Sequence, residues 1–172
     1  MQTILPALDY QDLDHLLAAQ EWQDADRATA DLLRQAIGQA EPIGLGVEAI
    51  AYLPCADLLQ IDQLWLRHSA RRFGFSVQQE IYTSLAHDAV QFSHAVGWTP
   101  WAAKPFAFFR FYSRLNFTLE APIGQFPALW FWQLSLENSL LAGGFGSGRG
   151  AGFVDADKLD ALMLRLERCS LQ

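Results

Sequence analysis

Residues 69–78, with the sequence Ser69-Ala70-Arg71-Arg72-Phe73-Gly74-Phe75-Ser76-Val77-Gln78, place two arginines directly before a glycine that lies between two phenylalanines. Ser76 and Gln79 have capping-box spacing, so a helix is expected to start here and to run through Ile81 and Leu85. The large apolar rings next to a flexible turn and two guanidinium groups suit an amphipathic ligand with a flat apolar body and carboxylate edges. The alternative is ordinary core packing of the phenylalanines, with the arginines solvating a turn.

Helical periodicity predicts the rest of the architecture. A first helix carries Leu13, Leu16 and Leu17 after Asp9 as N-cap, and a second runs from Trp22 to Ala36 and stops at Gly38. Further helices are expected after Pro54, after Asp88 and after Asp155. The predicted fold class is mainly α, a single helical domain with an irregular aromatic-rich region. The expected division is a helical domain over 1–142, a Gly-rich linker over 143–152 and a C-terminal helix over 153–172.

Residues 92–132 contain 13 of the 22 aromatic residues and four prolines. The proline spacing excludes long helices and favours extended segments and short turns, although residues 126–141 can form a helix. Three interpretations are open: core packing, a surface on which a ring-shaped ligand stacks, or a platform for single-stranded nucleic acid. In either binding case Lys104, Arg110 and Arg114 are candidate partners for acidic groups.

The charge distribution narrows these interpretations. The formal net charge is −7, which argues against nucleic acid as a partner. Residues 1–62 hold 11 acids and 2 bases, whereas residues 63–119 hold 2 acids and 6 bases. The middle of the chain is therefore where an anionic ligand is best tolerated.

The remaining sequence features suggest neither an enzyme nor a secreted protein. The four histidines are scattered, no nucleophile motif occurs, and the glycine run in 143–152 lacks the Lys-Ser/Thr ending of a phosphate loop. Cys55 and Cys169 have no metal-ligand spacing and suggest no disulfide framework, so a reducing, cytosol-like compartment is expected. No signal peptide, transit peptide or bilayer-spanning apolar run is expected either.

Six collinear segments resemble one known family, the porphyrin-binding regulators of magnesium chelatase called Genomes Uncoupled four. The first, residues 16–29, has the family's spacing L-L-x-x-x-x-W-x-x-A-D-x-x-T. The others are Leu53-Pro54-Cys55-Ala56-Asp57-Leu58, Ile61-Asp62-Gln63-Leu64-Trp65, Arg72-Phe73-Gly74-Phe75-Ser76-Val77-Gln78, Val96-Gly97-Trp98, and the loop from Phe117 through Ala121-Pro122-Ile123-Gly124-Gln125-Phe126-Pro127.

The resemblance implies a helical domain shaped like a cupped hand that binds protoporphyrin IX or magnesium protoporphyrin IX and has no catalytic activity. It also implies stimulation of magnesium chelatase through the large porphyrin-binding subunit of that enzyme, a role in chlorophyll biosynthesis and photosynthesis, and a cyanobacterial-type cytoplasmic location. Trp65 is expected to be core. By the same resemblance, the expected ligand-binding residues are Arg71, Arg72, Phe73, Phe75, Val77, Trp98, Arg114, Phe117, Leu119 and Phe126.

Three departures from the family pattern keep alternatives open, and one of them is the Trp130-Phe131-Trp132 stretch together with the Gly-rich linker. The family loop usually reads G-H-L-P, whereas this chain has Gly124-Gln125-Phe126-Pro127, and bases are sparse after Arg114. A module of the same fold that binds proteins without pigment is one alternative, and a linear bilin as ligand is another. The apolar segment Phe126–Leu141, with Glu137 as its sole charge, suggests a third property, peripheral attachment to a membrane. By the resemblance, this would be the thylakoid membrane.

Overall fold

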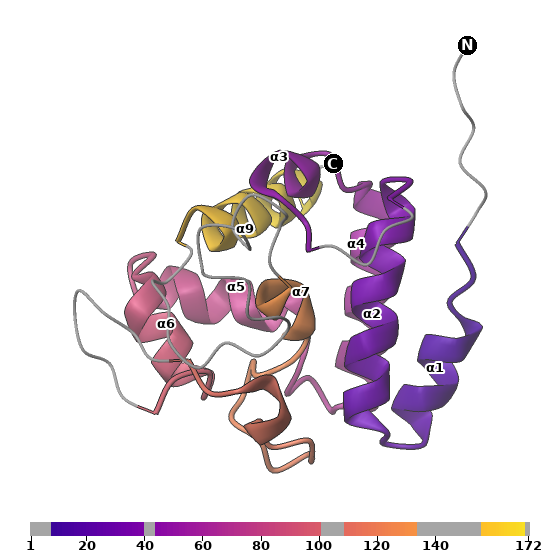
Figure 1. The fold of residues 1–172 in the computed structure, drawn as a ribbon, viewed down its shortest axis with the longest axis horizontal. Coiled ribbons are helices and arrows are strands. Elements are labelled where there is room, and N and C mark those ends of the chain that lie inside the picture. Colours follow the sequence, from indigo (N-terminus) through magenta and orange to yellow (C-terminus); the bar gives the residue numbers. More distant parts are fainter. Residues whose placement is uncertain (1–7, 40–43, 101–108, 134–155, 171–172) are drawn as a thin grey trace.

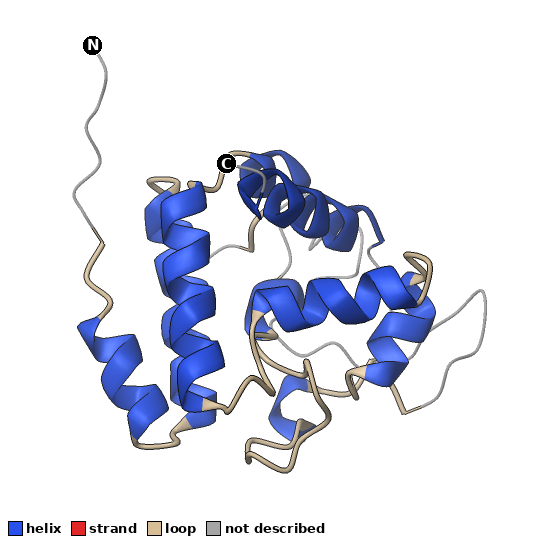
Figure 2. Ribbon diagram, turned by 180° about the vertical axis from the view of Figure 1, so that it is seen from behind, coloured by secondary structure: helices blue, strands red, loops and turns tan. Residues whose placement is uncertain are grey.

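The computed structural model describes residues 8–39, 44–100, 109–133 and 156–170, and these ranges contain helices and turns but no β-strand (Figures 1 and 2). The predicted mainly α fold class is therefore confirmed. The helices are α1 (Gln11–Ala18), α2 (Trp22–Ala36), α3 (Val47–Ala51), α4 (Cys55–His68), α5 (Phe75–Ser84), α6 (Ala89–Ala95), the 3₁₀ helix η1 (Tyr112–Arg114), α7 (Leu129–Trp132) and α9 (Ala156–Ser170).

Helices α1, α2 and α4 form an upright group on one side of the molecule, while α5 and α9 lie across the other side (Figure 1). The predicted bounds of α2 are confirmed, and Gly38 adopts a φ of 72° just beyond its end. Within this group Trp65 donates from Nε1 to Thr29 Oγ1 over 2.9 Å, and Thr29 in turn donates to the carbonyl oxygen of Ala25 over 2.9 Å. Trp65 is thus a core residue that joins α4 to α2, as the sequence predicted.

The start of α5 differs from the predicted capping box. Gly74, not Ser76, is the N-cap, with a φ of 142°, and the helix begins at Phe75. The backbone N–H of Ser76 donates to Asp62 Oδ1 on α4 over 2.9 Å, so a residue 14 positions earlier satisfies this end of the helix. A Cβ on Gly74 would lie 2.7 Å from the same Asp62 oxygen, which makes the position specific to glycine. By contrast, the predicted cap of α6 is confirmed, because Asp88 accepts from the N–H groups of Val90 and Gln91.

The aromatic-rich region is irregular, as its prolines predicted, and its described part is mostly buried. Only η1 and the four-residue α7 are helical between residues 109 and 133. Trp130, Phe131 and Trp132 are each at most 1% exposed, and Trp98 lies 4.9 Å from Phe131 between ring centroids. For these residues the core interpretation of the segment is correct.

The burial of α7 bears on the membrane hypothesis. Residues 126 and 128–132 are buried in the protein, so this half of the apolar segment Phe126–Leu141 is not a surface that could enter a lipid headgroup layer, and residues 134–141 lie outside the described ranges. None of the described helices combines the length and the apolar character needed to cross a bilayer.

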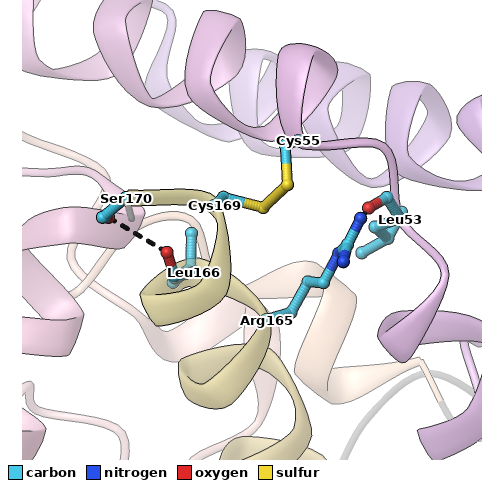
Figure 3. Close-up of a disulfide and its surroundings, with 6 residues drawn as sticks. All are labelled: Leu53, Cys55, Arg165, Leu166, Cys169 and Ser170. Atoms are coloured by element: carbon cyan, nitrogen blue, oxygen red, sulfur yellow. Dashed lines mark hydrogen bonds between the residues drawn. A yellow bond between two sulfur atoms is a disulfide. The ribbon is translucent and has the colours of Figure 1, made fainter. Parts of the chain in front are cut away.

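A C-terminal helix forms within the predicted range 153–172, and it folds back onto α3, α4 and α5. The predicted linker 143–152 and the predicted cap Asp155 lie outside the described residues. The expectation of no disulfide is wrong, because Cys55 and Cys169 are bonded to each other with their Cα atoms 5.2 Å apart (Figure 3). The bond spans 114 positions and depends on where α9 docks, which cysteine spacing does not reveal.

Candidate functional site

The turn at residues 72–75 and the loop at residues 117–127 lie against each other and are joined by backbone hydrogen bonds. Gly74 N donates to the carbonyl oxygen of Phe126 over 3.0 Å, and Gly124 N donates to that of Arg72 over 2.8 Å. The Arg72 guanidinium also donates to the carbonyl oxygens of Leu119 and Ala121, each over 2.8 Å. The structure therefore brings together the two segments that the sequence analysis placed around a ligand.

Phe73 of the turn and Phe126 of the loop pack against each other. Phe73, Phe75, Trp98 and Phe126 are all 0% exposed. The ring centroid of Phe126 lies 5.3 Å from that of Phe73, and 6.1 Å from that of Trp65. In this conformation all four side chains belong to the hydrophobic core, so a ligand would reach them only after the segments that cover them moved. Val77, on α5, is also buried.

Five of the predicted ligand residues keep exposed surface. We call them the arginine rim. Phe117 is half-buried and stacks on Phe126 with ring centroids 5.3 Å apart. Arg71 and Arg114 are exposed, and Arg72 and Leu119 are half-buried. Arg110 is exposed too, whereas Lys104 lies outside the described residues. The rim consists of Arg71, Arg72, Arg114, Phe117 and Leu119.

Asp26 joins α2 to η1 and to the start of α7. This carboxylate is fully buried and accepts from Tyr112 Oη over 2.9 Å, from Ala128 N over 2.8 Å and from Leu129 N over 3.0 Å. It thereby holds η1 and the start of α7 against α2. Burial raises the pKa of Asp26 to about 6, and the three donated hydrogen bonds act in the opposite direction. Sequence reasoning missed this role, although an aspartate four positions after Trp22, on the apolar stripe of α2, was a signal for it.

The titration of Asp26 predicts a pH dependence of stability. The folded protein retains the Asp26 proton up to a pKa of about 6, whereas the unfolded chain releases it near 3.8. The contribution of the carboxyl group to the free energy of unfolding is therefore largest below the unfolded-state pKa, and it falls by about 2 kcal/mol as the pH rises from 4 to 6. Urea unfolding at pH 4, 5, 6 and 7 gives the free energies of unfolding of the native protein and of Asp26→Asn. The difference between the two at each pH measures how the contribution of the Asp26 carboxyl group changes. A difference that stays constant across this range would contradict the prediction.

The loop at 117–127 is also held from the inside. Gln78 on α5 donates to the carbonyl oxygens of Gly124 and Pro127 over 2.9 and 2.8 Å, and Trp98 donates to that of Gln125 over 2.9 Å. Three buried acceptor atoms in this neighbourhood, Gln78 Oε1, Gln125 Oε1 and Thr99 Oγ1, find no hydrogen-bond partner in the described part of the chain. Buried acceptors of this kind are normally satisfied, so they are candidate contacts for a bound water or for a polar group of a ligand.

A separate groove lies between α3, α5 and α9 and shares no residue with the predicted ligand site. Its volume is about 1100 Å³. Four acidic residues and two arginines line it, which suits an anionic ligand less well than the arginine rim does. No set of three His, Cys, Asp or Glu residues that could hold a metal ion occurs in the described ranges. The charged lining consists of Glu48, Asp157, Asp160, Glu167, Arg165 and Arg168.

Comparison with known proteins identifies the family. The model of the family described as GUN4-like matches residues 6–142, well over half of the chain. The chain belongs to the GUN4-like family. The match extends from the N-terminal helices to beyond α7, so in this GUN4-like protein the arginine rim lies within the matched residues and α9 follows them.

Three relatives of this GUN4-like chain come from an alga, a cyanobacterium and a plant. An uncharacterized protein ycf53 of Porphyra purpurea is 39% identical over 53% of the chain and 39% of its own length. A Ycf53-like protein of Synechocystis is 29% identical over 71% of the chain and 52% of its own length. A chloroplastic tetrapyrrole-binding protein of Arabidopsis thaliana is 35% identical over 50% of the chain and 33% of its own length. The chain thus spans about half or less of the length of these relatives.

The fold of the GUN4-like chain is similar to that of a solved relative. The ligand-free structure of Arabidopsis thaliana GUN4 matches 94% of this chain and 95% of its own chain, with a TM-score of 0.61 and 24% sequence identity. At that identity the likeness concerns the fold, and it covers nearly the whole length of both chains.

Proposed function

We propose that this GUN4-like protein binds a porphyrin-type tetrapyrrole, protoporphyrin IX or magnesium protoporphyrin IX, without catalysing a reaction. The observation that carries the proposal is family membership over residues 6–142 together with a plant relative whose name states tetrapyrrole binding. The arginine rim supports it chemically. A porphyrin has a flat apolar face and two carboxylates, and the rim offers apolar side chains flanked by guanidinium groups.

The proposed site is the arginine rim, extended by the residues behind it when the loop opens. Phe117 offers a ring face for stacking, and the exposed guanidinium groups of Arg71 and Arg114 are available to the propionates. Apolar burial at about 25 cal/mol per Å² would supply most of the affinity, so the arginines would set the orientation of the ring more than its affinity. Reaching the buried residues Phe73, Phe75, Val77, Trp98 and Phe126 requires the surrounding segments to move. The loop at 117–127 would have to give up its hydrogen bonds to Arg72, Gly74, Gln78 and Trp98.

Titration with pigment tests the proposal. Protoporphyrin IX, magnesium protoporphyrin IX and biliverdin are added to micromolar protein, and the Soret or bilin absorption band and tryptophan fluorescence are followed. We expect a shifted absorption band and quenched fluorescence with at least one porphyrin. If all three pigments leave both spectra unchanged, the proposed function is wrong.

Substitutions in the arginine rim test which part of the ligand binds there. Phe117→Ala should weaken porphyrin binding about tenfold at any salt concentration, since a stacked aromatic pair is worth about 1 kcal/mol beyond its buried area. Arg114→Ala should weaken binding about two- to fivefold at low salt and hardly at 0.5 M salt, because exposed charges are screened. Tyr52→Ala is the matched control, because Tyr52 is 80% exposed and lies directly after α3. Equal affinities for Phe117→Ala and Tyr52→Ala would exclude the rim as the site.

The remaining parts of the proposal concern the cellular role. By family, the protein would regulate magnesium chelatase by contacting its large porphyrin-binding subunit, in the cytoplasm of a cyanobacterial-type cell or at its thylakoid surface, and would serve chlorophyll biosynthesis. A pull-down with the chelatase large subunit, with and without magnesium protoporphyrin IX, tests the contact. If the subunit is captured neither with nor without magnesium protoporphyrin IX, the proposed regulatory role is wrong. Pigment binding is tested separately by the titration.

A second candidate function is a protein-binding module without pigment. The complete burial of Phe73, Phe75, Trp98 and Phe126 favours it, because these side chains are not accessible to a ligand in this conformation. Capture of the chelatase subunit by a protein that binds none of the three pigments would support this candidate over the first.

A further inference from the structure

The disulfide joins two elements that lie far apart in the sequence. Cys55 is the first residue of α4, and Cys169 lies in the last turn of α9. Figure 3 shows the bond bridging these helices beside a second contact, in which Arg165 Nε of α9 donates to the carbonyl oxygen of Leu53 over 2.7 Å. The C-terminal end of α9 is thus attached to the start of α4 by one covalent and one polar link.

The other end of α9 is held by different contacts. Lys158 Nζ donates to the carbonyl oxygens of Trp130 and Gln133, each over 2.7 Å, and Tyr82 donates to Asp160 over 2.7 Å. These contacts reach α7 and α5 and do not involve the disulfide. Breaking the disulfide would therefore loosen the last turns of α9 first, while its N-terminal turns keep their own partners.

The two sulfur atoms differ in access. Cys55 is half-buried, whereas Cys169 is 3% exposed. An incoming thiolate would therefore attack the Cys55 sulfur, since exchange needs in-line access to the sulfur that is attacked.

We propose that the Cys55–Cys169 bond is a reversible modification site whose reaction partner is a dithiol reductant. One thiolate of the dithiol attacks Cys55 Sγ, forms a mixed disulfide and releases Cys169 as a thiolate, which takes up a proton. The second thiol of the reductant loses its proton and attacks the mixed disulfide, which frees Cys55. Overall the protein gains two electrons and two protons, and the dithiol becomes a disulfide.

The consequence of the reaction is local. Helix α9 lies outside the residues that match the family and forms one wall of the groove between α3, α5 and α9. Leu164 and Arg168 on that wall lie in the half of α9 that the disulfide holds. Reduction frees this half and opens the groove, while the turn at 72–75 and the loop at 117–127 keep their hydrogen bonds. In the oxidised protein the C-terminal half of α9 is held against the start of α4, and in the reduced protein this half is loosened.

The experiment combines thiol counting with hydrogen exchange on the full chain. Air-oxidised protein is alkylated before and after incubation with dithiothreitol, and peptide-resolved exchange is measured in both states. We expect no alkylated cysteine before reduction and two after it. Exchange in residues 162–170 should accelerate by roughly tenfold or more, with little change in α2 and α5. Reoxidation should restore the original rates.

Two variants separate the proposal from its alternatives. Cys169→Ser should show the fast exchange of residues 162–170 without reductant and no response to dithiothreitol. Ser170→Ala, next to the disulfide but outside it, should behave as the native protein does. Two alkylated cysteines before reduction, unchanged exchange in α9 after reduction, or faster exchange in every helix would each overturn the proposal, the last because the bond would then be a general structural link.

Discussion

Phe126→Ala is expected to lower the free energy of unfolding by about 3–5 kcal/mol, the largest effect among the single substitutions considered. The Phe126 ring is 0% exposed and contacts the rings of Trp65, Phe73 and Phe117. Its removal leaves a cavity between α4, the turn at 72–75 and the loop at 117–127, and close packing gives such a cavity few ways to collapse. Urea unfolding followed by tryptophan fluorescence measures the change.

Phe111→Ala is the matched control for this substitution. Phe111 belongs to the same aromatic-rich region but is 56% exposed, so its loss should change the free energy of unfolding by less than about 1 kcal/mol. Similar effects at both positions would show that Phe126 is not closed into the core, and the buried aromatic cluster would then have to be open to solvent.

Asp26→Ala is expected to lower the free energy of unfolding by about 2–4 kcal/mol at pH 7. The substitution leaves three buried donors without an acceptor, the hydroxyl of Tyr112 and the N–H groups of Ala128 and Leu129. Each orphaned donor costs about 1–2 kcal/mol, and removal of a buried charge offsets part of the total. Thermal or urea unfolding gives the magnitude.

Asp24→Ala provides the comparison on the same helix. Asp24 pairs with Arg27 at the surface, where both side chains are more than half exposed, so its loss should cost less than about 0.5 kcal/mol. If Asp26→Ala proved as mild as Asp24→Ala, the carboxylate would not be the link between α2 and the segment around α7. Pigment binding by Asp26→Ala at 15 °C would show in addition whether the rim depends on that link.

The sequence predicted the elements whose signals are local. The apolar stripe and terminal glycine of α2 gave its bounds, and Asp88 gave the start of α6, because each signal lies within a few residues of the element that it controls. The five-residue α3 was missed, since one turn and a half carries no periodicity to detect. The start of α5 was misplaced because the partner of its N–H groups, Asp62, comes from the preceding helix.

The candidate site could be predicted only as a neighbourhood. The sequence placed the turn at 72–75 beside the loop at 117–127, and the hydrogen bonds between them show that proximity. Whether an aromatic ring faces a ligand or the interior depends on how far the loop closes, and Phe73 and Phe117 carry the same signal in sequence despite different burial. The disulfide was missed for a related reason, since it depends on the path by which α9 returns to α4.

The hydrogen bond from Trp65 to Thr29 has a consequence for how proteins of this family are recognised. The family spacing within residues 16–29 includes four residues of α2 that are buried in this protein and support its fold. They are Trp22, Ala25, Asp26 and Thr29. A search built on that spacing selects chains able to adopt this architecture, whether or not they carry a pigment. Orthologues that have kept or lost pigment should instead be sorted by the exposed positions 71 and 114, which have no place in the buried scaffold.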